Sequence, residues 1–196
     1  MTPDHPTGGT GAMIVVVGPS GAGKDSVIDY AMTRLKTRST EVELVRRVIT
    51  RAHDAGGEDH EAISPEAFCA RAEQGAFAVH WEAHGLHYGI PAACHAKLKD
   101  GRTLVANGSR AVLEKFREAF PRVAVVNIVA SPEVIAARLI ARARESEAEI
   151  RQRLARQVPD MTSDPHLTTI DNSGPLEEAG ERFAAFVLSL AKAEAS

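Results

Sequence analysis

The sequence predicts an α/β fold whose central sheet is mostly parallel, and three observations support this prediction. Short, continuous apolar runs such as MIVVV (13–17) are typical of strands buried on both faces of a parallel sheet. These runs alternate along the chain with segments of helical pattern, as strands and helices do in βαβ units. A glycine-rich loop separates the first apolar run from the first helical segment. We therefore expect a layered domain with a parallel sheet at its centre.

The elements follow from these patterns in chain order. Ser131, Pro132 and Glu133 supply an N-cap, a first-turn proline and an early acid, which mark the start of a helix. Ser64 and Pro65 repeat that signal ahead of a short helix. The predicted strands are 13–17, 43–50, 103–107, 123–130 and, as a weaker edge or terminal strand, 167–171. The predicted helices are 24–36, 66–74, 109–119, 132–143, 147–157 and 175–193.

The composition indicates a soluble globular protein of 196 residues, of which 44% are hydrophobic and 25% charged. A net charge of −3 gives no reason to expect nucleic acid or a membrane as the main partner. The longest apolar run is far shorter than the ~20 residues of a membrane-spanning helix, and no signal peptide is evident. Cys69 and Cys94 suit a reducing, cytoplasmic location, and we interpret both as packing residues rather than as a disulfide. Residues 1–12 are predicted to be a disordered tail before a single domain at 13–196.

The alternation of strands and helices breaks down between residues 52 and 97. We expect this stretch to be an inserted subdomain over the loop ends of the sheet, where ligands bind in open α/β folds. Its histidines suggest a zinc site as one interpretation, because zinc sites use His and Cys. Neighbouring residues of a strand point to opposite faces, so these side chains would not converge, and we prefer substrate contact or surface. The residues concerned are His80, His84, His87, Cys94 and His95.

The glycine-rich loop GPSGAGKDS (18–26) follows the phosphate-binding pattern G-x-x-x-x-G-K-[ST] in all but one position. In that pattern the glycines let backbone N–H groups surround phosphate oxygens, the lysine reaches the β- and γ-phosphates, and the final hydroxyl holds Mg²⁺. A glycine-rich turn that happens to precede a helix is the alternative, but the flanking strand and helix favour a nucleoside triphosphate site. That site comprises Gly18, Pro19, Ser20, Gly21, Ala22, Gly23, Lys24, Asp25 and Ser26, with Lys24 as a catalytic residue.

Asp25 stands where the pattern has Ser or Thr. The helix dipole stabilises an acidic residue in the first turn of any helix, by roughly 0.3–1 kcal/mol when it is exposed. This explanation is incomplete here, because polyphosphate repels a carboxylate that has no counter-ion. Mg²⁺ between them removes the repulsion, since Mg²⁺ prefers oxygen ligands that include carboxylates. The hypothesis is that Asp25 binds Mg²⁺ directly or through water, and that Ser26 assists.

The segment 138–156 carries six arginines on two predicted helices joined by a short turn. A solvated charged face is one interpretation. Phosphoryl transfer needs positive charge around the moving group, and a lid that closes over ATP would supply it while excluding water. We therefore interpret Arg138, Arg142 and Arg153 as catalytic residues of such a lid, and Arg144, Arg151 and Arg156 as surface residues.

Taken in order, these motifs resemble those of the guanylate kinase superfamily. The matching segments over about residues 13–156 are GPSGAGKDS, VITR, GEDHEAISPEAF, HYGIP, RLIAR and RQRL. The segment DNSG (171–174) extends the match and adds Asn172 to the nucleotide site. The resemblance implies a three-layer P-loop fold of the nucleoside-monophosphate-kinase type. It also implies that 52–97 is a substrate-binding insertion and that 138–156 is an arginine lid.

Departures from that family concern the recognition of guanine. The resemblance places an acidic residue at His80, a serine at Ile90 and an aspartate near Asn107. Guanine needs groups that accept its N1 and N2 hydrogens, and Ile90 cannot hydrogen-bond at all. Arg51 matches one of the family's two phosphate-binding arginines, whereas Asp54 takes the place of the second. The phosphate contacts are partly retained and the base contacts are lost.

A family member without a base reader is expected to act on a phosphate that carries no base. The segments GKDS and NGSR resemble those of the ribose 1,5-bisphosphate phosphokinases of phosphonate catabolism (the PhnN family). This resemblance implies that ATP and α-D-ribose 1,5-bisphosphate give ADP and 5-phosphoribosyl 1-diphosphate, with Mg²⁺ as cofactor. The alternatives are an atypical guanylate or other nucleoside monophosphate kinase, and a non-catalytic guanylate-kinase-like binding module.

The substrate contacts are assigned partly by family position. Arg51 and Tyr88 are the best candidates for substrate contact by family position, followed by His60, which lies where the family has a phosphate-binding tyrosine. Near the ends of strands, arginines are expected to reach the second phosphate and small polar side chains the ribose hydroxyls. These are Arg47 and Arg110, and Asn107 and Ser109, respectively.

Overall fold

The computed structural model describes residues 11–37, 41–52, 58–141 and 167–192, and in this part of the chain it has two β-sheets. Among the described residues, the central sheet has five parallel strands in the order β2-β7-β1-β8-β9. These strands are β1 (Met13–Val17), β2 (Val42–Leu44), β7 (Thr103–Asn107), β8 (Val123–Val129) and β9 (Leu167–Asp171). The predicted parallel sheet is confirmed, with β9 at its edge.

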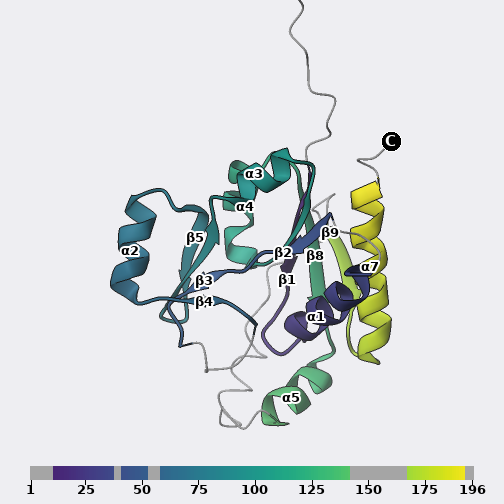
Figure 1. Ribbon diagram of the computed structural model, residues 1–196. Helices are drawn as coiled ribbons and strands as arrows, with labels where there is room; N and C mark the ends of the chain where they lie inside the picture. The colour runs from purple at the N-terminus through teal and green to yellow at the C-terminus, as the bar shows by residue number, and fades with distance from the viewer. Residues whose placement is uncertain (1–10, 38–40, 53–57, 142–166, 193–196) are drawn as a thin grey trace, which may run out of the picture.

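A second sheet lies beside the central one, with its strands in the order β4-β3-β6-β5 (Figure 1). The strands are β3 (Val48–Ile49), β4 (Glu61–Ala62), β5 (Phe77–Ala83) and β6 (Leu86–Pro91). β5 and β6 form an antiparallel hairpin, whose turn contains His84 and Gly85 at φ values of 54° and 72°. Most of this sheet falls where the strand–helix alternation fails, and the limits 52–97 of an insertion stay a prediction.

Most helices in the described ranges begin close to the positions expected from the sequence, but the short helix Cys94–Lys99 is not among those predicted, and the predicted helix 147–157 lies outside the described residues. They are α1 (Lys24–Leu35), α2 (Pro65–Glu73), α3 (Cys94–Lys99), the 3₁₀ turn η2 (Arg110–Val112), α4 (Leu113–Ala119), α5 (Pro132–Ala141) and α7 (Leu176–Lys192). Ser64 Oγ accepts the amide hydrogen of Ala67 at 3.2 Å, and Ser131 Oγ that of Val134 at 3.3 Å. Both predicted N-caps are therefore confirmed.

Side chains of β1 alternate between two cores, one on each face of the sheet. Ile14 and Val16 pack with α1 and α7, which lie side by side on one face (Figure 1). Met13, Val15 and Val17 pack on the other face with α3, α4 and the β5–β6 hairpin. Full burial of one such valine or isoleucine stabilises the fold by about 1.5–3 kcal/mol. The predicted three-layer arrangement is confirmed.

The predicted strand 43–50 is wrong, because this segment contributes to both sheets. The Val45 amide still donates to the Val105 carbonyl of the central sheet at 2.8 Å. Two residues later, the Arg47 carbonyl accepts from the Glu61 amide of the second sheet, also at 2.8 Å. The chain therefore leaves the central sheet at Arg46 and Arg47, and this crossing carries Arg47 to the candidate site described below.

Three further expectations concern the N-terminal segment of the chain and its two cysteines. Gly11 and Ala12 are buried, and the Gly11 amide donates to the Leu98 carbonyl at 2.8 Å, so the predicted disordered tail is wrong for these two residues. Residues 1–10 lie outside the described ranges. Both cysteines are free in the structure; Cys94 is buried and packs as predicted, whereas Cys69 is exposed and is not a packing residue.

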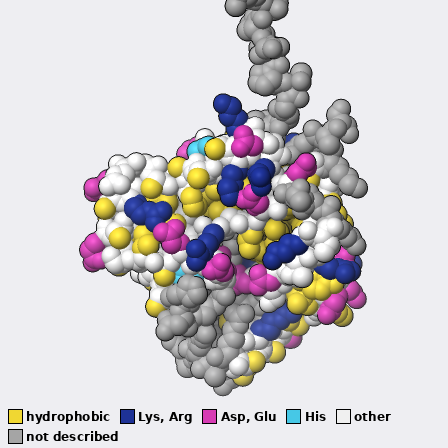
Figure 2. All heavy atoms as spheres, viewed as in Figure 1, with side chains coloured by type: hydrophobic (Ala, Val, Ile, Leu, Met, Phe, Trp, Pro, Cys, Tyr) yellow, Lys and Arg dark blue, Asp and Glu magenta, His cyan; other side chains and the backbone are white. Residues whose placement is uncertain are grey.

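The surface carries both signs of charge. On the face seen in Figure 2, basic and acidic side chains are interspersed. Within the described residues, no helix has the combination of length and apolar character that a bilayer-spanning segment needs.

Candidate active site

The loop between β1 and α1 has a backbone that only glycine adopts readily. Gly18, Gly21 and Gly23 have φ values of 149°, 89° and 87°. A Cβ atom on Gly18 would lie 2.1 Å from the Ile128 carbonyl oxygen, and one on Gly23 would lie 2.5 Å from Asn172 Nδ2. The loop is thus closely packed against its neighbours, and it ends in the first turn of α1, whose positive dipole end favours anions.

Lys24 is the first residue of α1, and its ammonium group turns back over the loop. Nζ donates to the carbonyl oxygens of Gly18 at 2.9 Å and Pro19 at 3.2 Å. Burial lowers the pKa of Lys24; the neighbouring Asp25 raises it in part, and Arg47 and Arg110 lower it further. A cation that has lost much of its water and is crowded by other cations gains when a phosphate arrives.

A cavity of about 350 Å³ opens beside Lys24 at the carboxyl end of β1 and β7. In parallel sheets this edge is where ligands bind. Ten residues predicted for the site line it, namely Gly18, Ser20, Lys24, Asp25, Arg47, Arg51, Tyr88, Asn107, Ser109 and Arg110. The other lining residues are Glu58, Trp81, Ala83, His84 and Gly108. Cationic side chains outnumber carboxylates in this lining, so the cavity suits an anion.

Asp25 and Asn107 meet at the phosphate-loop end of the cavity. Asn107 is the buried last residue of β7, and its Nδ2 donates to Asp25 Oδ1 at 2.7 Å. Asn107 stands where the family resemblance expects an aspartate, and its amide group instead orients the carboxylate of Asp25. The second oxygen of Asp25 keeps its acceptor capacity.

This arrangement fits Mg²⁺, because a protein commonly holds that ion through one or two carboxylates, with substrate phosphates and waters completing the shell. Ser26, the other predicted metal residue, is exposed and is not among the residues that line the cavity. Asp25 is therefore the better placed of the two to hold a metal ion.

Arg47, which is buried, and Glu58, which is partly buried, form an ion pair in the wall of the cavity. The guanidinium binds both carboxylate oxygens, through Nε to Oε2 at 3.1 Å and through Nη2 to Oε1. Arg47 Cζ also lies 5.1 Å from the centre of the Tyr88 ring and 5.8 Å from that of Trp81. The two rings are stacked with their centres 5.3 Å apart, so the arginine is held on two sides.

Arg51 and Arg110 have donors to spare. The Nε atom of each is buried and has no hydrogen-bond partner among the described residues. Arg110 Nη2 donates to Asn127 Oδ1 at 2.7 Å, which directs this side chain across the end of the sheet. Because buried donors without partners are costly, both guanidinium groups suit an anion that the cavity would bind.

His60 is not brought to the cavity. It is buried, with Nδ1 3.0 Å from the Glu58 carbonyl oxygen and Nε2 3.1 Å from the Arg51 carbonyl oxygen. The ring thereby links the backbone of two lining residues that are seven positions apart in the sequence. A direct contact between His60 and substrate stays a prediction, while its observed contacts hold Arg51 and Glu58 in place.

Arg138 and Asn172 lie behind the phosphate loop. Arg138 donates through Nη1 to the Ala22 carbonyl at 3.2 Å and through Nη2 to the Asn172 carbonyl at 2.9 Å. Asn172 Nδ2 donates to the same Ala22 carbonyl at 2.7 Å. Both side chains therefore support the loop, and their predicted catalytic and nucleotide-binding roles stay predictions. Arg142 and Arg153 lie outside the described residues, as does most of the predicted lid 138–156.

Of the three histidines of the β5–β6 hairpin, one lines the cavity and the other two pack against the same phenylalanine ring. His84 lines the cavity, whereas the His87 ring stacks on Phe68 with ring centres 5.3 Å apart and His80 meets Phe68 edge-on at 6.3 Å. Within the described ranges, no group of three or more His, Cys, Asp or Glu side chains could hold a metal ion.

Glu58 and Trp81 line the cavity but are not among the site residues predicted from the sequence, and His84 is interpreted there only as a substrate contact or a surface residue. Glu58 belongs to GEDHEAIS, a segment that contributes to the family resemblance, so its presence there is the signal that points to the site. For Trp81 the signal is its position directly after His80. Neither signal specifies that Glu58 pairs with Arg47.

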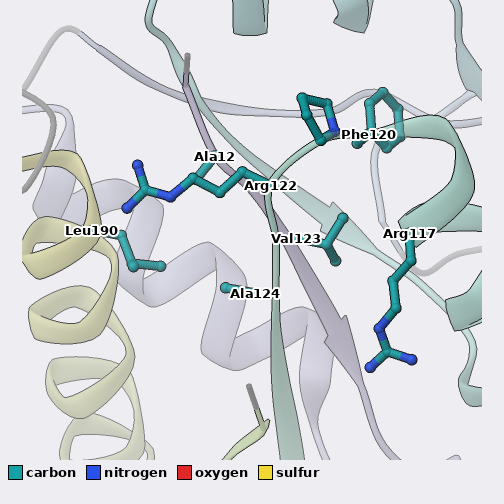
Figure 3. A pocket seen from close by; sticks show the side chains of 8 residues that line it. Ala12, Arg117, Phe120, Arg122, Val123, Ala124 and Leu190 are labelled. Atoms are coloured by element: carbon teal, nitrogen blue, oxygen red, sulfur yellow. The ribbon is translucent and has the colours of Figure 1, made fainter. Parts of the chain in front are cut away.

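A second, larger pocket of about 420 Å³ lies at the opposite, amino-terminal edge of the central sheet. Figure 3 shows Arg122 extending toward Leu190 of α7, while Arg117 lies on the other side of Val123. No residue of the phosphate loop lines this pocket. The pocket is therefore not the candidate phosphate site, although it is the larger of the two.

The fold and the cation-lined cavity define a class, the P-loop phosphotransferases. Comparison with known proteins narrows that class. The family model for guanylate kinase matches residues 10–189, and the chain belongs to the guanylate kinase family.

Within that family, two similar relatives bear the name ribose 1,5-bisphosphate phosphokinase PhnN. The protein from Rhizobium etli is 49% identical over 185 residues, which cover 93% of each chain. The protein from Agrobacterium fabrum is 53% identical over 169 residues, covering 86% of this chain and 92% of the relative. The predicted resemblance is thus confirmed.

A solved structure supports the fold. The guanylate kinase from Anaplasma phagocytophilum superposes with a TM-score of 0.68 at 19% identity, over 93% of this chain and 87% of that one. At this identity the likeness concerns the fold alone.

Proposed function

We propose that the protein transfers the γ-phosphoryl group of ATP to ribose 1,5-bisphosphate, giving ADP and 5-phosphoribosyl 1-diphosphate. The observation that carries the proposal is the cavity beside the phosphate loop, which is lined by Lys24, Arg47, Arg51 and Arg110. An acceptor with two phosphates and no base matches such a lining. Relatives named for this reaction, at 49% and 53% identity, support the same acceptor.

A nucleoside monophosphate is the less suitable acceptor. Of the three positions at which the resemblance expects guanine contacts, Ile90 is fully buried in the core and His80 packs near Phe68 outside the cavity lining. Asn107 does line the cavity, but its amide nitrogen donates to Asp25. These positions offer a base no pair of acceptors.

The chemistry requires positioning and neutralisation of charge rather than a general base. The second pKa of a phosphate monoester is ~6, so the attacking oxygen of the 1-phosphate is already ionised at neutral pH. That oxygen forms a bond to the γ-phosphorus as the bond to the β-γ bridging oxygen breaks, and the electron pair leaves with ADP. Lys24 exchanges its two carbonyl contacts for phosphate oxygens, and Arg51 and Arg110 hold the acceptor in line.

Asp25 is the residue proposed to hold Mg²⁺, with Asn107 orienting its carboxylate. When bound, Mg²⁺ neutralises negative charge on the β- and γ-phosphates. A cytoplasmic location and a place in phosphonate catabolism, both expected from the sequence, accompany this proposal.

The test is ADP release from Mg-ATP by the purified protein, with ribose 1,5-bisphosphate and GMP as separate acceptors. We expect turnover with the bisphosphate and a new diphosphate signal in the phosphorus NMR spectrum. Lys24→Met is the control that excludes a contaminating kinase. Turnover with GMP and none with the bisphosphate would overturn the proposal.

A further inference from the structure

The cavity offers many hydrogen-bond donors and few acceptors. Lysine and arginine only donate, whereas an ionised carboxylate only accepts. Among the lining residues the carboxylates are Asp25 and Glu58. A ribose bisphosphate brings phosphate oxygens that accept, but it also brings sugar hydroxyls whose hydrogens need acceptors. The donors in the lining serve the phosphates, and the carboxylates are the strongest acceptors for the hydroxyls.

The two carboxylates lie in different parts of the site. Asp25 belongs to the first turn of α1, directly after Lys24, and bonds to Asn107. Glu58 is fixed against Arg47, which packs over Trp81 and Tyr88. The acid at the nucleotide end is thus Asp25, and the acid at the acceptor end is Glu58.

Glu58 is held rigidly enough to act as a recognition group. Its side chain is 15% exposed, and the Arg47 guanidinium binds both of its oxygens. Its carbonyl oxygen contacts Nδ1 of the buried His60 at 3.0 Å. A carboxylate has about four lone-pair positions, so it can accept further hydrogen bonds while it is paired with an arginine.

The same ion pair makes Arg47 a poor anchor for phosphate. Glu58 engages two of its five N–H donors and neutralises its charge, so a phosphate gains less from Arg47 than from a guanidinium that has no carboxylate partner. Arg51 and Arg110 each keep a buried Nε without a partner among the described residues. The phosphates are therefore better served by Arg51 and Arg110, which leaves the Arg47–Glu58 pair facing the sugar.

We propose that Glu58 is a specificity residue that accepts a hydrogen bond from a ribose hydroxyl of the acceptor substrate. This inference rests on the proposed function and deepens it. It assigns the recognition of a ribose hydroxyl to a residue other than Lys24, Arg51 and Arg110, which are assigned to the phosphates. A site that hydrogen-bonds a substrate hydroxyl rejects analogues that lack it, since its own polar group is then left without a partner.

The experiment compares ribose 1,5-bisphosphate with its 2-deoxy and 3-deoxy analogues, by ADP release from Mg-ATP. For the wild-type protein we expect kcat/KM to fall by about 10- to 100-fold for at least one analogue, the range of a hydrogen bond to a charged group. The discrimination ratio is kcat/KM for ribose 1,5-bisphosphate divided by kcat/KM for the deoxy analogue. In Glu58→Gln we expect this ratio to fall to about threefold or less, because the charged acceptor is gone.

The matched control is Glu61→Gln. Glu61 also pairs with an arginine, Arg71, through one carboxylate oxygen, and it is more exposed than Glu58 and is not among the residues that line the cavity. The same substitution there should leave the wild-type ratio unchanged. Glu58→Asp keeps the charge and withdraws it by one methylene, so it should also reduce the ratio and serves as the second variant if Glu58→Gln does not fold.

Each outcome separates the two proposals. Wild-type turnover of the bisphosphate without discrimination against either analogue would overturn this inference alone. The same holds if Glu58→Gln lowers kcat/KM equally for all three substrates, because Glu58 would then only hold Arg47. No turnover of ribose 1,5-bisphosphate by the wild-type protein would overturn the proposed function, and this inference with it.

Discussion

The contact between Asp25 and Asn107 allows a charge test of the site that does not depend on turnover. Asn107→Asp replaces the amide that donates to Asp25 Oδ1 at 2.7 Å with a second carboxylate. Two unit charges ~4 Å apart repel by about 4 kcal/mol at an effective dielectric constant of 20. Asp25 is only half-buried, which reduces this figure. We expect Asn107→Asp to lower the free energy of unfolding by about 1–3 kcal/mol at pH 8 without Mg²⁺.

The pH dependence of this loss has a definite sign. Two adjacent carboxylates raise one another's pKa in the folded variant, so one of them holds a proton more tightly there than in the unfolded chain. The variant then loses stability as the pH rises above ~4, the pKa of an unperturbed aspartate. Its loss of unfolding free energy relative to the wild-type protein is therefore smaller at pH 5 than at pH 8. Added Mg²⁺ should also reduce the deficit at pH 8, because it binds between the carboxylates.

The assay is urea-induced unfolding at low ionic strength, with the exchanged pair Asp25→Asn/Asn107→Asp as the control. The exchange restores a single charge and a single amide–carboxylate bond, so it should recover at least half of the loss. If Asn107→Asp is as stable as the wild-type protein at pH 8, the two side chains do not meet in solution. The same conclusion follows if the exchanged pair is no more stable than Asn107→Asp.

Three further predictions concern other parts of the structure. Lys24→Met should lower kcat by about 100-fold or more, because one preorganised charge at the moving phosphoryl group is lost. Thermal unfolding should show no loss of stability. A kcat within tenfold of that of the wild-type protein would contradict this role. Gly18→Ala should destabilise the protein by about 1–3 kcal/mol in urea unfolding, because its Cβ would lie 2.1 Å from the Ile128 carbonyl oxygen. An unchanged unfolding midpoint would refute the loop geometry. At pH 8 in the native state, mass spectrometry should detect rapid alkylation of the exposed Cys69 only. Burial raises the pKa of Cys94 to about 11, which leaves about a thousandth of it as thiolate, and equally fast addition at both thiols would count against this burial.

Local sequence patterns were sufficient where the structure depends on residues that are adjacent in the chain. The strand–loop–helix unit around Lys24 is of this kind, since each glycine at positive φ lies within the motif itself. The N-caps at Ser64 and Ser131 are also local, because a cap requires only the next three residues. The segment 43–50 is the counter-example. Its apolar residues indicate a strand, but hydrophobic pattern alone does not specify the sheet in which each half is paired.

The sequence by itself therefore determined the class of fold, the phosphate loop and the family to which the chain belongs. Each of these is encoded in contiguous motifs. The tertiary structure alone decided which polar side chains meet, because such pairs join residues from different elements. Asn107 lies 82 positions from the Asp25 that it orients, and Arg47 reaches Glu58 only because the chain crosses between two sheets at that point. Burial is reflected in the periodicity of a sequence, whereas the pairing of charges depends on the path of the chain through space.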